Sequence, residues 1–213
     1  NLVNIMGLKF GKEYNTESDV KTLRYGHLMV MADQDTDGSH IKGLVINFLH
    51  HFWPSLLDRP GFLQQFITPI VKATKGKRSK TFFNLPEYTS WLEETGNQGK
   101  GWTIKYYKGL GTSTSAEAKD YFSNLDTHEV NFARLEDDKF QPEEDDEFGK
   151  VLPDTVASGS DIIDMVFRKS RVEDRKQWLN NAPTETFLDY SEATQEGVKY
   201  SDFINKEYIL FSR

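Results

Sequence analysis

The chain has 213 residues, of which 37% are hydrophobic and 13% aromatic, with no cysteine and a formal net charge of -7. This length and composition allow one sizeable packed domain, and the lack of cysteine excludes disulfides and thiolate chemistry and fits an intracellular protein. No apolar run is long enough to span a membrane and no signal peptide opens the chain. Because the sequence lacks an initiator Met and starts inside an apparent folded segment, we expect it to be an excised fragment.

The excess negative charge is local. The segment 136–147 contains eight acidic residues and one lysine, which accounts for the whole excess. The overall charge argues against a simple nucleic-acid-binding domain of high pI, but basic clusters elsewhere in the nearly neutral remainder can still face a polyanion.

Periodicity and chain breakers predict the elements in order. Short helices are expected within 1–10 and 9–25, strands at 27–32, 62–73 (with Pro69 at a bulge or edge), 81–85 and 102–107, and helices at 86–94, 114–125 and 161–181. Residues 74–80 predict a basic hairpin tip, with a phosphate contact as the alternative, and 126–159 predict an acidic loop. Residues 183–197 predict a polar linker, and 200–211 an amphipathic segment whose partner lies beyond Arg213.

The stretch 31–40 is best suited to chemistry. An apolar run, 28–31, predicts a buried parallel strand that leads into Asp33, Asp35 and Asp37. In an extended backbone alternate side chains point the same way, so these carboxylates can converge. Like charges this close repel unless a cation neutralises them, and a hard divalent ion such as Mg²⁺ prefers oxygen ligands. The pattern therefore favours a metal site, with a solvated acidic turn as the alternative.

A helix is expected after the acids, with Gly38 in a tight turn and Ser39 as N-cap. Its apolar face would contain Ile41, Leu44, Val45, Phe48, Leu49 and Phe52, and Pro54 would end or kink it. The acids then lie at the carboxyl end of a strand, where open α/β sheets bind ligands. An EF-hand loop is disfavoured, because its twelfth position would be Leu44 instead of Glu and a strand enters it.

A second motif lies at 108–113. Lys108, Gly109 and Gly111 follow a predicted strand, and Thr114 with Glu117 predicts a capping box for the next helix. A strand, a glycine turn and a helix N-terminus together form a possible anion site, with a plain turn as the alternative. The lysine precedes the glycines, so this is not a P-loop. Further along, the basic face of helix 161–181, including Arg175 and Lys176, is either solvated or contacts phosphates.

The residues resemble eukaryotic DNA topoisomerase II, a type IIA enzyme. The resemblance is carried by Met-Ala-Asp-Gln-Asp-Thr-Asp-Gly-Ser-His-Ile-Lys-Gly-Leu at 31–44, Tyr-Tyr-Lys-Gly-Leu-Gly-Thr-Ser at 106–113, Phe-Ile-Thr-Pro-Ile-Val-Lys at 66–72, Asp-Arg-Lys-Gln-Trp-Leu at 174–179 and Asp-Phe-Ile-Asn-Lys-Glu-Tyr-Ile-Leu-Phe-Ser at 202–212. It implies an α/β fold: a Toprim (Rossmann-like) parallel sheet flanked by helices, incomplete at its N-terminus, with a helical C-terminal extension. The implied divisions are a partial Toprim domain (1–128), an acidic variable loop (129–160), a C-terminal Toprim helix and linker (161–196) and the start of a winged-helix domain (197–213).

The resemblance also implies a function: ATP-dependent cleavage, passage and religation of double-stranded DNA. Asp33, Asp35 and Asp37 would bind Mg²⁺, which stabilises the scissile phosphate and the leaving 3′ oxygen. DNA contacts are implied for His40, Lys108, Arg175 and Lys176, and Lys108 with Gly109 and Gly111 would form the turn at the metal site.

Two parts of the family's machinery are absent from this sequence. The family's metal-binding Glu lies in an upstream Glu-Gly-Asp-Ser-type motif, and its attacking tyrosine lies beyond Arg213, so the fragment alone is expected to be inactive. The ATP-binding domain is also outside the chain. Implied partners are double-stranded DNA, a second protomer, and the flanking ATPase and winged-helix domains, with nuclear location. The alternatives are an interaction module without metal, or a Toprim nuclease or primase.

Overall fold

The computed structural model describes residues 1–96, 99–139, 152–183, 186–190 and 197–212. The strands are β1 (Leu28–Met31), β2 (Leu63–Phe66), β3 (Val71–Lys75), β4 (Arg78–Phe82), β5 (Thr103–Tyr106) and β6 (Glu129–Asn131). The α-helices are α1 (Leu2–Met6), α2 (Glu17–Val20), α3 (Thr36–Phe52), α4 (Pro54–Leu57), α5 (Leu85–Glu94), α6 (Ser115–Ser123), α7 (Leu125–His128), α8 (Gly159–Phe167), α9 (Val172–Asn181), α10 (Tyr200–Asp202) and α11 (Ile209–Ser212). Short 3-10 helices η1 (Leu110–Thr112), η2 (Leu135–Asp137) and η3 (Lys169–Arg171) and the π-helix η5 (Phe203–Tyr208) complete the described elements.

The α/β class is confirmed, with two small sheets. In the first sheet β1 pairs in parallel with β2, and β2 pairs antiparallel with β6. In the second sheet β3 pairs antiparallel with β4 and β5. The expected parallel pairing is found between β1 and β2, and β6, a strand from the segment that was expected to be an acidic loop, adds an antiparallel neighbour. Hydrophobic alternation missed β6 because it has only three residues, of which one is buried.

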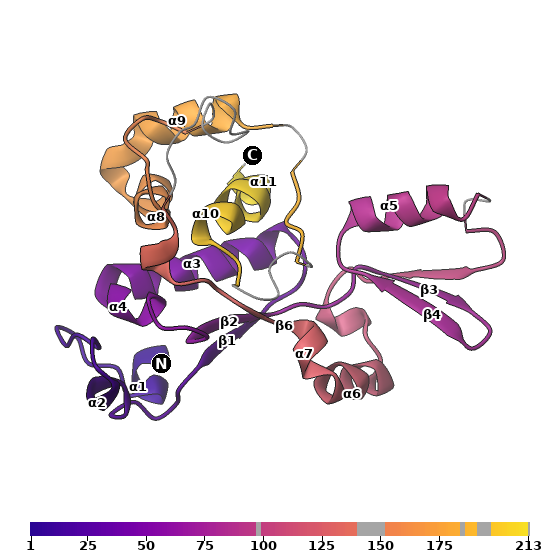
Figure 1. Cartoon of the computed structure of the whole chain (residues 1–213), viewed down its shortest axis with the longest axis horizontal. Helices are drawn as coiled ribbons and strands as arrows, with labels where there is room; N and C mark the ends of the chain where they lie inside the picture. The colour runs from indigo at the N-terminus through magenta and orange to yellow at the C-terminus, as the bar shows by residue number, and fades with distance from the viewer. Residues whose placement is uncertain (97–98, 140–151, 184–185, 191–196, 213) are drawn as a thin grey trace.

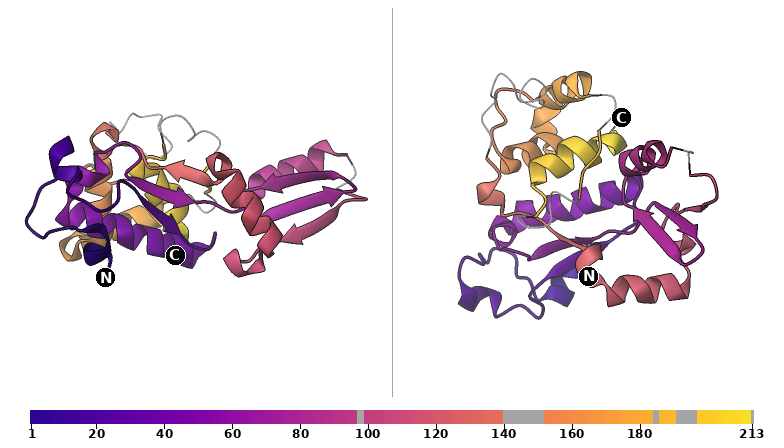
Figure 2. Two further views of the ribbon diagram at one scale, coloured as in Figure 1. Left: turned by 90° about the horizontal axis from the view of Figure 1, so that it is seen from below. Right: turned by 45° about the vertical axis from the view of Figure 1, so that its right-hand side comes forward.

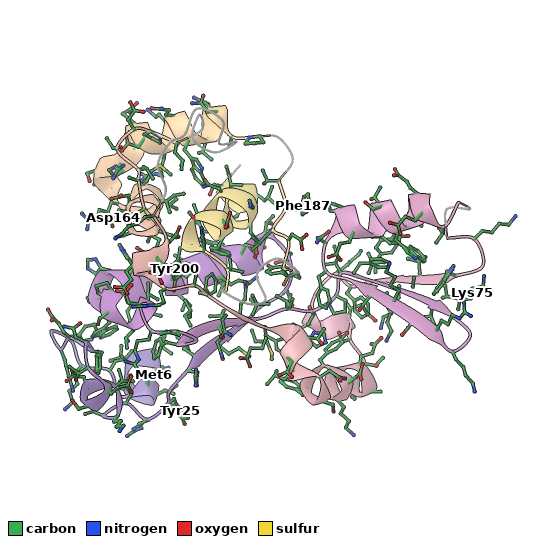
Figure 3. The ribbon with its side chains drawn as sticks, in the orientation of Figure 1. Met6, Tyr25, Lys75, Asp164, Phe187 and Tyr200 are labelled. Carbon is green, nitrogen blue, oxygen red and sulfur yellow. The ribbon has the colours of Figure 1, made fainter. Side chains whose placement is uncertain are left out.

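The strand expected over 62–73 is two strands in different sheets. Pro69 lies between β2 and β3, and because proline lacks an N–H donor it cannot continue a sheet ladder. Figures 1 and 2 show the second sheet and α5 protruding from one end of the molecule. The basic hairpin is confirmed as β3–β4, and Figure 3 shows Lys75 at its outer end.

Helix α3 lies between the first sheet and the C-terminal helices α10 and α11 (Figure 1). The main core surrounds it and includes Leu49, Leu56, Ile162 and Phe203, which have at most 1% of their surface exposed. The segment 200–212 therefore packs on α3 within this chain, and the expectation that its partner lies beyond Arg213 is wrong. No described helix is both long and apolar enough to cross a bilayer.

The helix expected over 161–181 is two helices. Ser158 caps α8, and the backbone at Arg168 is extended (φ -76°, ψ 133°), so α8 ends at Phe167 and α9 begins after a 3-10 turn. Helix α8 contains no lysine or arginine, so the basic residues of this stretch begin at Arg168 and lie in the turn and in α9; helix propensity alone gives no sign of the break.

The acidic segment is not uniformly solvated. Asp138 is 1% exposed, and its carboxylate accepts hydrogen bonds from the Ser201 N–H at 2.8 Å and the Ser201 hydroxyl at 2.6 Å. Burial raises the pKa of Asp138, and this residue joins the segment to α10. Residues 140–151, which hold most of the remaining acids, lie outside the described residues. The domain limits taken from the resemblance remain predictions.

Candidate functional site

The acidic turn, residues 33–37, connects β1 to α3. β1 is confirmed where the apolar run predicts it, but α3 begins at Thr36, earlier than expected. The N-cap is Asp35, with an extended backbone (φ -132°, ψ 179°) and a carboxylate that accepts the Gly38 N–H at 2.7 Å. The expectation of Ser39 as the cap is therefore wrong, because the Asp35 carboxylate, four residues earlier, already accepts one of the free N–H groups in the first turn of the helix.

This early helix start changes the geometry of the acids. β1 ends at Met31, before the first of the acids, and Asp37 lies in the first helical turn, so the backbone argument for convergence of all three carboxylates is wrong. Among the described residues no group of three or more Asp, Glu, His or Cys side chains is placed to hold a metal. Gly38 is needed inside the helix and not in a turn, because a Cβ there would overlap the Asp33 carbonyl oxygen.

Asp33 is held by the second motif. Its Oδ1 accepts the Leu110 N–H at 2.6 Å, although the two residues are 77 positions apart. Gly109 lies so close that an added Cβ would be 2.6 Å from Asp33 Oδ2. The turn at 108–113, expected near the acids, thus lies directly against Asp33 and leaves room for it only because Gly109 has no side chain.

The oxygen donors of the acidic turn fit a small hard cation. Within the described ranges, none of Asp33, Asp35 and Asp37 forms an ion pair with lysine or arginine. Mg²⁺ commonly binds through one or two protein carboxylates, keeps several waters and reaches a substrate phosphate. Asp33, oriented by Leu110, and Asp35, at the start of α3, supply that number without Asp37.

The N–H groups at the glycine turn and at the start of α6 are bonded to the protein's own side chains, beginning with the Leu110 N–H, which donates to Asp33. The expected capping box of α6 is confirmed: Thr114 accepts the Glu117 N–H, and Glu117 accepts the Thr114 N–H. Glu117 also accepts from Lys105 at 2.8 Å and Tyr107 at 2.5 Å. Burial would raise the pKa of Glu117, but these hydrogen bonds together lower it to about 2. The N-terminus of α6 is therefore capped by the protein's own side chains.

The residues expected to contact DNA lie in different surroundings. Lys108 is exposed at the turn beside Asp33. His40 is half-buried and stacks on Phe211 with ring centres 3.9 Å apart. Arg175 donates to the Met165 and Arg168 carbonyls at 2.8 and 2.6 Å, so its guanidinium caps the C-terminal end of α8.

Two further residues predicted from the sequence are Lys176, expected to contact DNA, and Gly111, expected in the turn at the metal site. The Lys176 side chain is 63% exposed and pairs with Glu173 at 2.8 Å. Gly111 has open space where a Cβ would lie, with nothing within 4 Å, so close backbone packing does not require glycine there.

The sequence analysis did not identify the side chains on the buried face of α3, the helix that follows the acidic turn. On α3 the buried face contains Ser39, Lys42, Gly43, Ile46 and Leu49, whereas the expected face is wrong at Ile41, Leu44 and Phe52, which are 51%, 42% and 41% exposed. Lys42 is buried because Glu207 pairs with it at 2.7 Å. The spacing of Ser39, Lys42 and Ile46 is helical, but a lysine is normally assigned to the solvent side of a helix.

Comparisons with known proteins all point to the same family. The family model for the C-terminal associated domain of TOPRIM matches residues 66–213. DNA topoisomerase 2 of Caenorhabditis elegans is 48% identical over 99% of this chain, and a probable DNA topoisomerase 2 of Dictyostelium discoideum is 50% identical over 100% of it. The chain spans 13% and 12% of the lengths of these two relatives. The crystal structure of the Plasmodium falciparum topoisomerase II DNA-binding, cleavage and re-ligation domain matches all of this chain and 25% of that chain, with 45% identity and a TM-score of 0.80.

Proposed function

Because this chain belongs to the TOPRIM-associated C-terminal domain family of the eukaryotic type II DNA topoisomerases, we propose that it forms the Mg²⁺-binding part of such an enzyme's DNA-cleavage core. Asp33 and Asp35 would hold the ion, and Asp37 would act as a third acid, directly or through water. The bound ion would stabilise charge on the scissile phosphate and the leaving 3′ oxygen. The attacking tyrosine and one further Glu ligand would come from outside this chain.

The observation that carries this proposal is the placement of Asp33. Its carboxylate lies after β1 and is oriented by the Leu110 N–H of a second, distant motif. A carboxylate fixed in this way keeps Oδ2 for a cation instead of rotating freely in solvent. Lys108, which is exposed on the same turn, would contact a DNA phosphate beside the ion.

The wider context follows from the same proposal. The complete enzyme would act on double-stranded DNA as a homodimer in the nucleus, and the segment that hydrolyses ATP would lie elsewhere in its chain. His40, Arg175 and Lys176 remain proposed DNA contacts. Of these, Arg175 would do so with the donors that its two carbonyl bonds leave over.

The test is Mg²⁺-dependent cleavage of supercoiled plasmid by the full-length enzyme. Asp33→Ala and Asp35→Ala should each abolish detectable double-strand breaks, because each removes a charged ligand. Asp126→Ala, a matched change of an exposed aspartate on α7, should cleave within about twofold of the unmodified enzyme. Circular dichroism of each variant checks that it is folded. Normal cleavage by both ligand variants would overturn the proposal.

A further inference from the structure

A buried polar network joins the acidic turn to the C-terminal π-helix. Its centre is the carboxylate of Glu207 on η5. Glu207 Oε1 accepts from the Ser39 hydroxyl and from Lys42 Nζ, each at 2.7 Å. Glu207 Oε2 accepts from the Tyr190 hydroxyl. The Lys42 side chain is 1% exposed and that of Glu207 12%, so this ion pair lies almost entirely inside the protein.

Tyr190 extends the network to the acids themselves. Its hydroxyl oxygen accepts from Gln34 Nε2 at 2.9 Å, and Gln34 stands between Asp33 and Asp35 in the chain. Burial and the adjacent Glu207 carboxylate raise the pKa of Tyr190, so the hydroxyl keeps its proton and donates to Glu207. Gln34 is therefore tied to η5 through one intervening hydroxyl.

Ser39 provides a second connection. Its N–H donates to the Asp35 carbonyl at 3.0 Å within the first turn of α3, and its hydroxyl donates to Glu207. Lys42 lies one turn further along the same buried face. Glu207 thus fixes the first two turns of α3. Without Glu207, Lys42 Nζ and the Tyr190 hydroxyl would lose this acceptor in a buried site, whereas the Ser39 hydroxyl also lies 3.1 Å from the Asp35 carbonyl oxygen.

Packing brings η5 close enough for these bonds. A Cβ at Gly43 would overlap the Tyr208 ring, so Gly43 allows the ring to lie directly on the α3 backbone. The π-helical winding is local to Phe203–Tyr208, between α10 and α11. Such π-helical turns are rare and frequently occur at functional sites.

We propose that Glu207 is a positioning residue for the metal ligands: through Tyr190–Gln34 and through Ser39 it sets the orientation of Asp33 and Asp35. This inference rests on the proposed role of those two acids. It assigns a purpose to a buried ion pair that contributes little net stability compared with apolar packing. It also means that the C-terminal helical segment, η5 with α11, and the metal ligands are held as one unit.

The first experiment requires no metal. Amide hydrogen exchange is measured over residues 33–39 in the full-length, metal-free enzyme carrying Tyr190→Phe. Removing the hydroxyl should speed exchange there about 5- to 10-fold, as expected for one lost buried hydrogen bond. The matched control is Ser201→Ala, which deletes a hydroxyl that donates to buried Asp138 at 2.6 Å and should leave exchange at 33–39 unchanged.

The second experiment measures plasmid cleavage by the same variants against Mg²⁺ concentration. Outer-shell changes commonly weaken metal binding 10- to 100-fold, so Tyr190→Phe should raise the half-saturating Mg²⁺ concentration about 10-fold. Cleavage at saturating Mg²⁺ should stay within about twofold of the unmodified enzyme, a separation that general destabilisation does not produce. Ser201→Ala should leave the half-saturating concentration unchanged.

A second variant protects the test against misfolding. The double substitution Lys42→Met/Glu207→Met removes both charges together, so no buried charge is left unpaired, and it should change exchange and Mg²⁺ dependence in the same direction. Unchanged exchange and Mg²⁺ dependence in both variants would overturn the inference. If Asp33→Ala cleaves normally while exchange still rises in Tyr190→Phe, then the proposed function fails and the network remains a structural connection only.

Discussion

Substitution of Gly109 by alanine is a sharp test of the contact that holds Asp33. The backbone there is extended (φ 166°), so alanine introduces no conformational strain. The new methyl group would lie 2.6 Å from Asp33 Oδ2 and 3.0 Å from Oδ1, where ordinary contacts begin at 3.4 Å. The carboxylate must therefore move by about 0.8 Å, or the turn must withdraw and break its Leu110 hydrogen bond.

Either response misplaces a ligand of the proposed metal site. Misplacement by about 1 Å can cost roughly 100-fold in rate, so we expect Gly109→Ala to cleave DNA about 10- to 100-fold more slowly. Overpacking of this kind should also lower the free energy of unfolding by about 1–3 kcal/mol.

The assay is single-turnover plasmid cleavage by the full-length enzyme at several Mg²⁺ concentrations, with thermal unfolding measured in parallel. Gly111→Ala is the matched control, because a Cβ there meets nothing within 4 Å. It makes the same chemical change two residues along the same turn and should cleave within about twofold of the unmodified enzyme. If Gly109→Ala cleaves as fast as Gly111→Ala, then the turn does not position Asp33 for cleavage.

Three further predictions concern stability. The pKa of Glu117 is lowered from 4.5 to about 2, so the charged side chain stabilises the fold above pH 4.5 and loses that effect as the pH falls toward 2. Over that range the free energy of unfolding in urea should fall by about 3 kcal/mol more in the unmodified protein than in Glu117→Gln. Gly43→Ala should lower the free energy of unfolding, measured by thermal denaturation, by about 1–3 kcal/mol, because the added methyl group would overlap the Tyr208 ring. Gly26→Ala should lower it far less, because a Cβ there meets nothing within 4 Å. Arg175→Ala should lower the free energy of unfolding by about 1–3 kcal/mol, because it removes two hydrogen bonds to carbonyl groups. Lys176→Ala should lower it by less than about 0.5 kcal/mol, and equal losses in the two variants would contradict the capping role of Arg175.

The sequence was most informative where local rules decide the structure. The apolar run before the acids predicted β1, and the spacing of Thr114 and Glu117 predicted the capping box of α6. Proximity of the glycine turn to the acids came only from the family resemblance, because the Leu110–Asp33 bond spans 77 positions and no local pattern encodes it.

Errors occurred where a local rule had two valid solutions. Asp35 and Ser39 are both good N-caps, and only the early choice carries Asp37 from an extended backbone into a helical turn. Lys42 belongs to the buried face because its partner Glu207 lies 165 positions away. The partner of the C-terminal segment was likewise invisible until α3 and η5 were seen together.

The two sheets belong to separate hydrophobic cores of very different size. The smaller core, around β3, β4 and α5, includes only five buried hydrophobic residues among those described: Val71, Ala73, Phe82, Tyr88 and Trp91. The turn whose Leu110 N–H donates to Asp33 follows β5, in the sheet of the smaller core, whereas Asp33 itself follows β1, in the sheet of the larger core. Local unfolding requires less free energy where few apolar contacts are buried. Moderate heating should therefore break the hydrogen bond between the Leu110 N–H and Asp33 before the larger core unfolds.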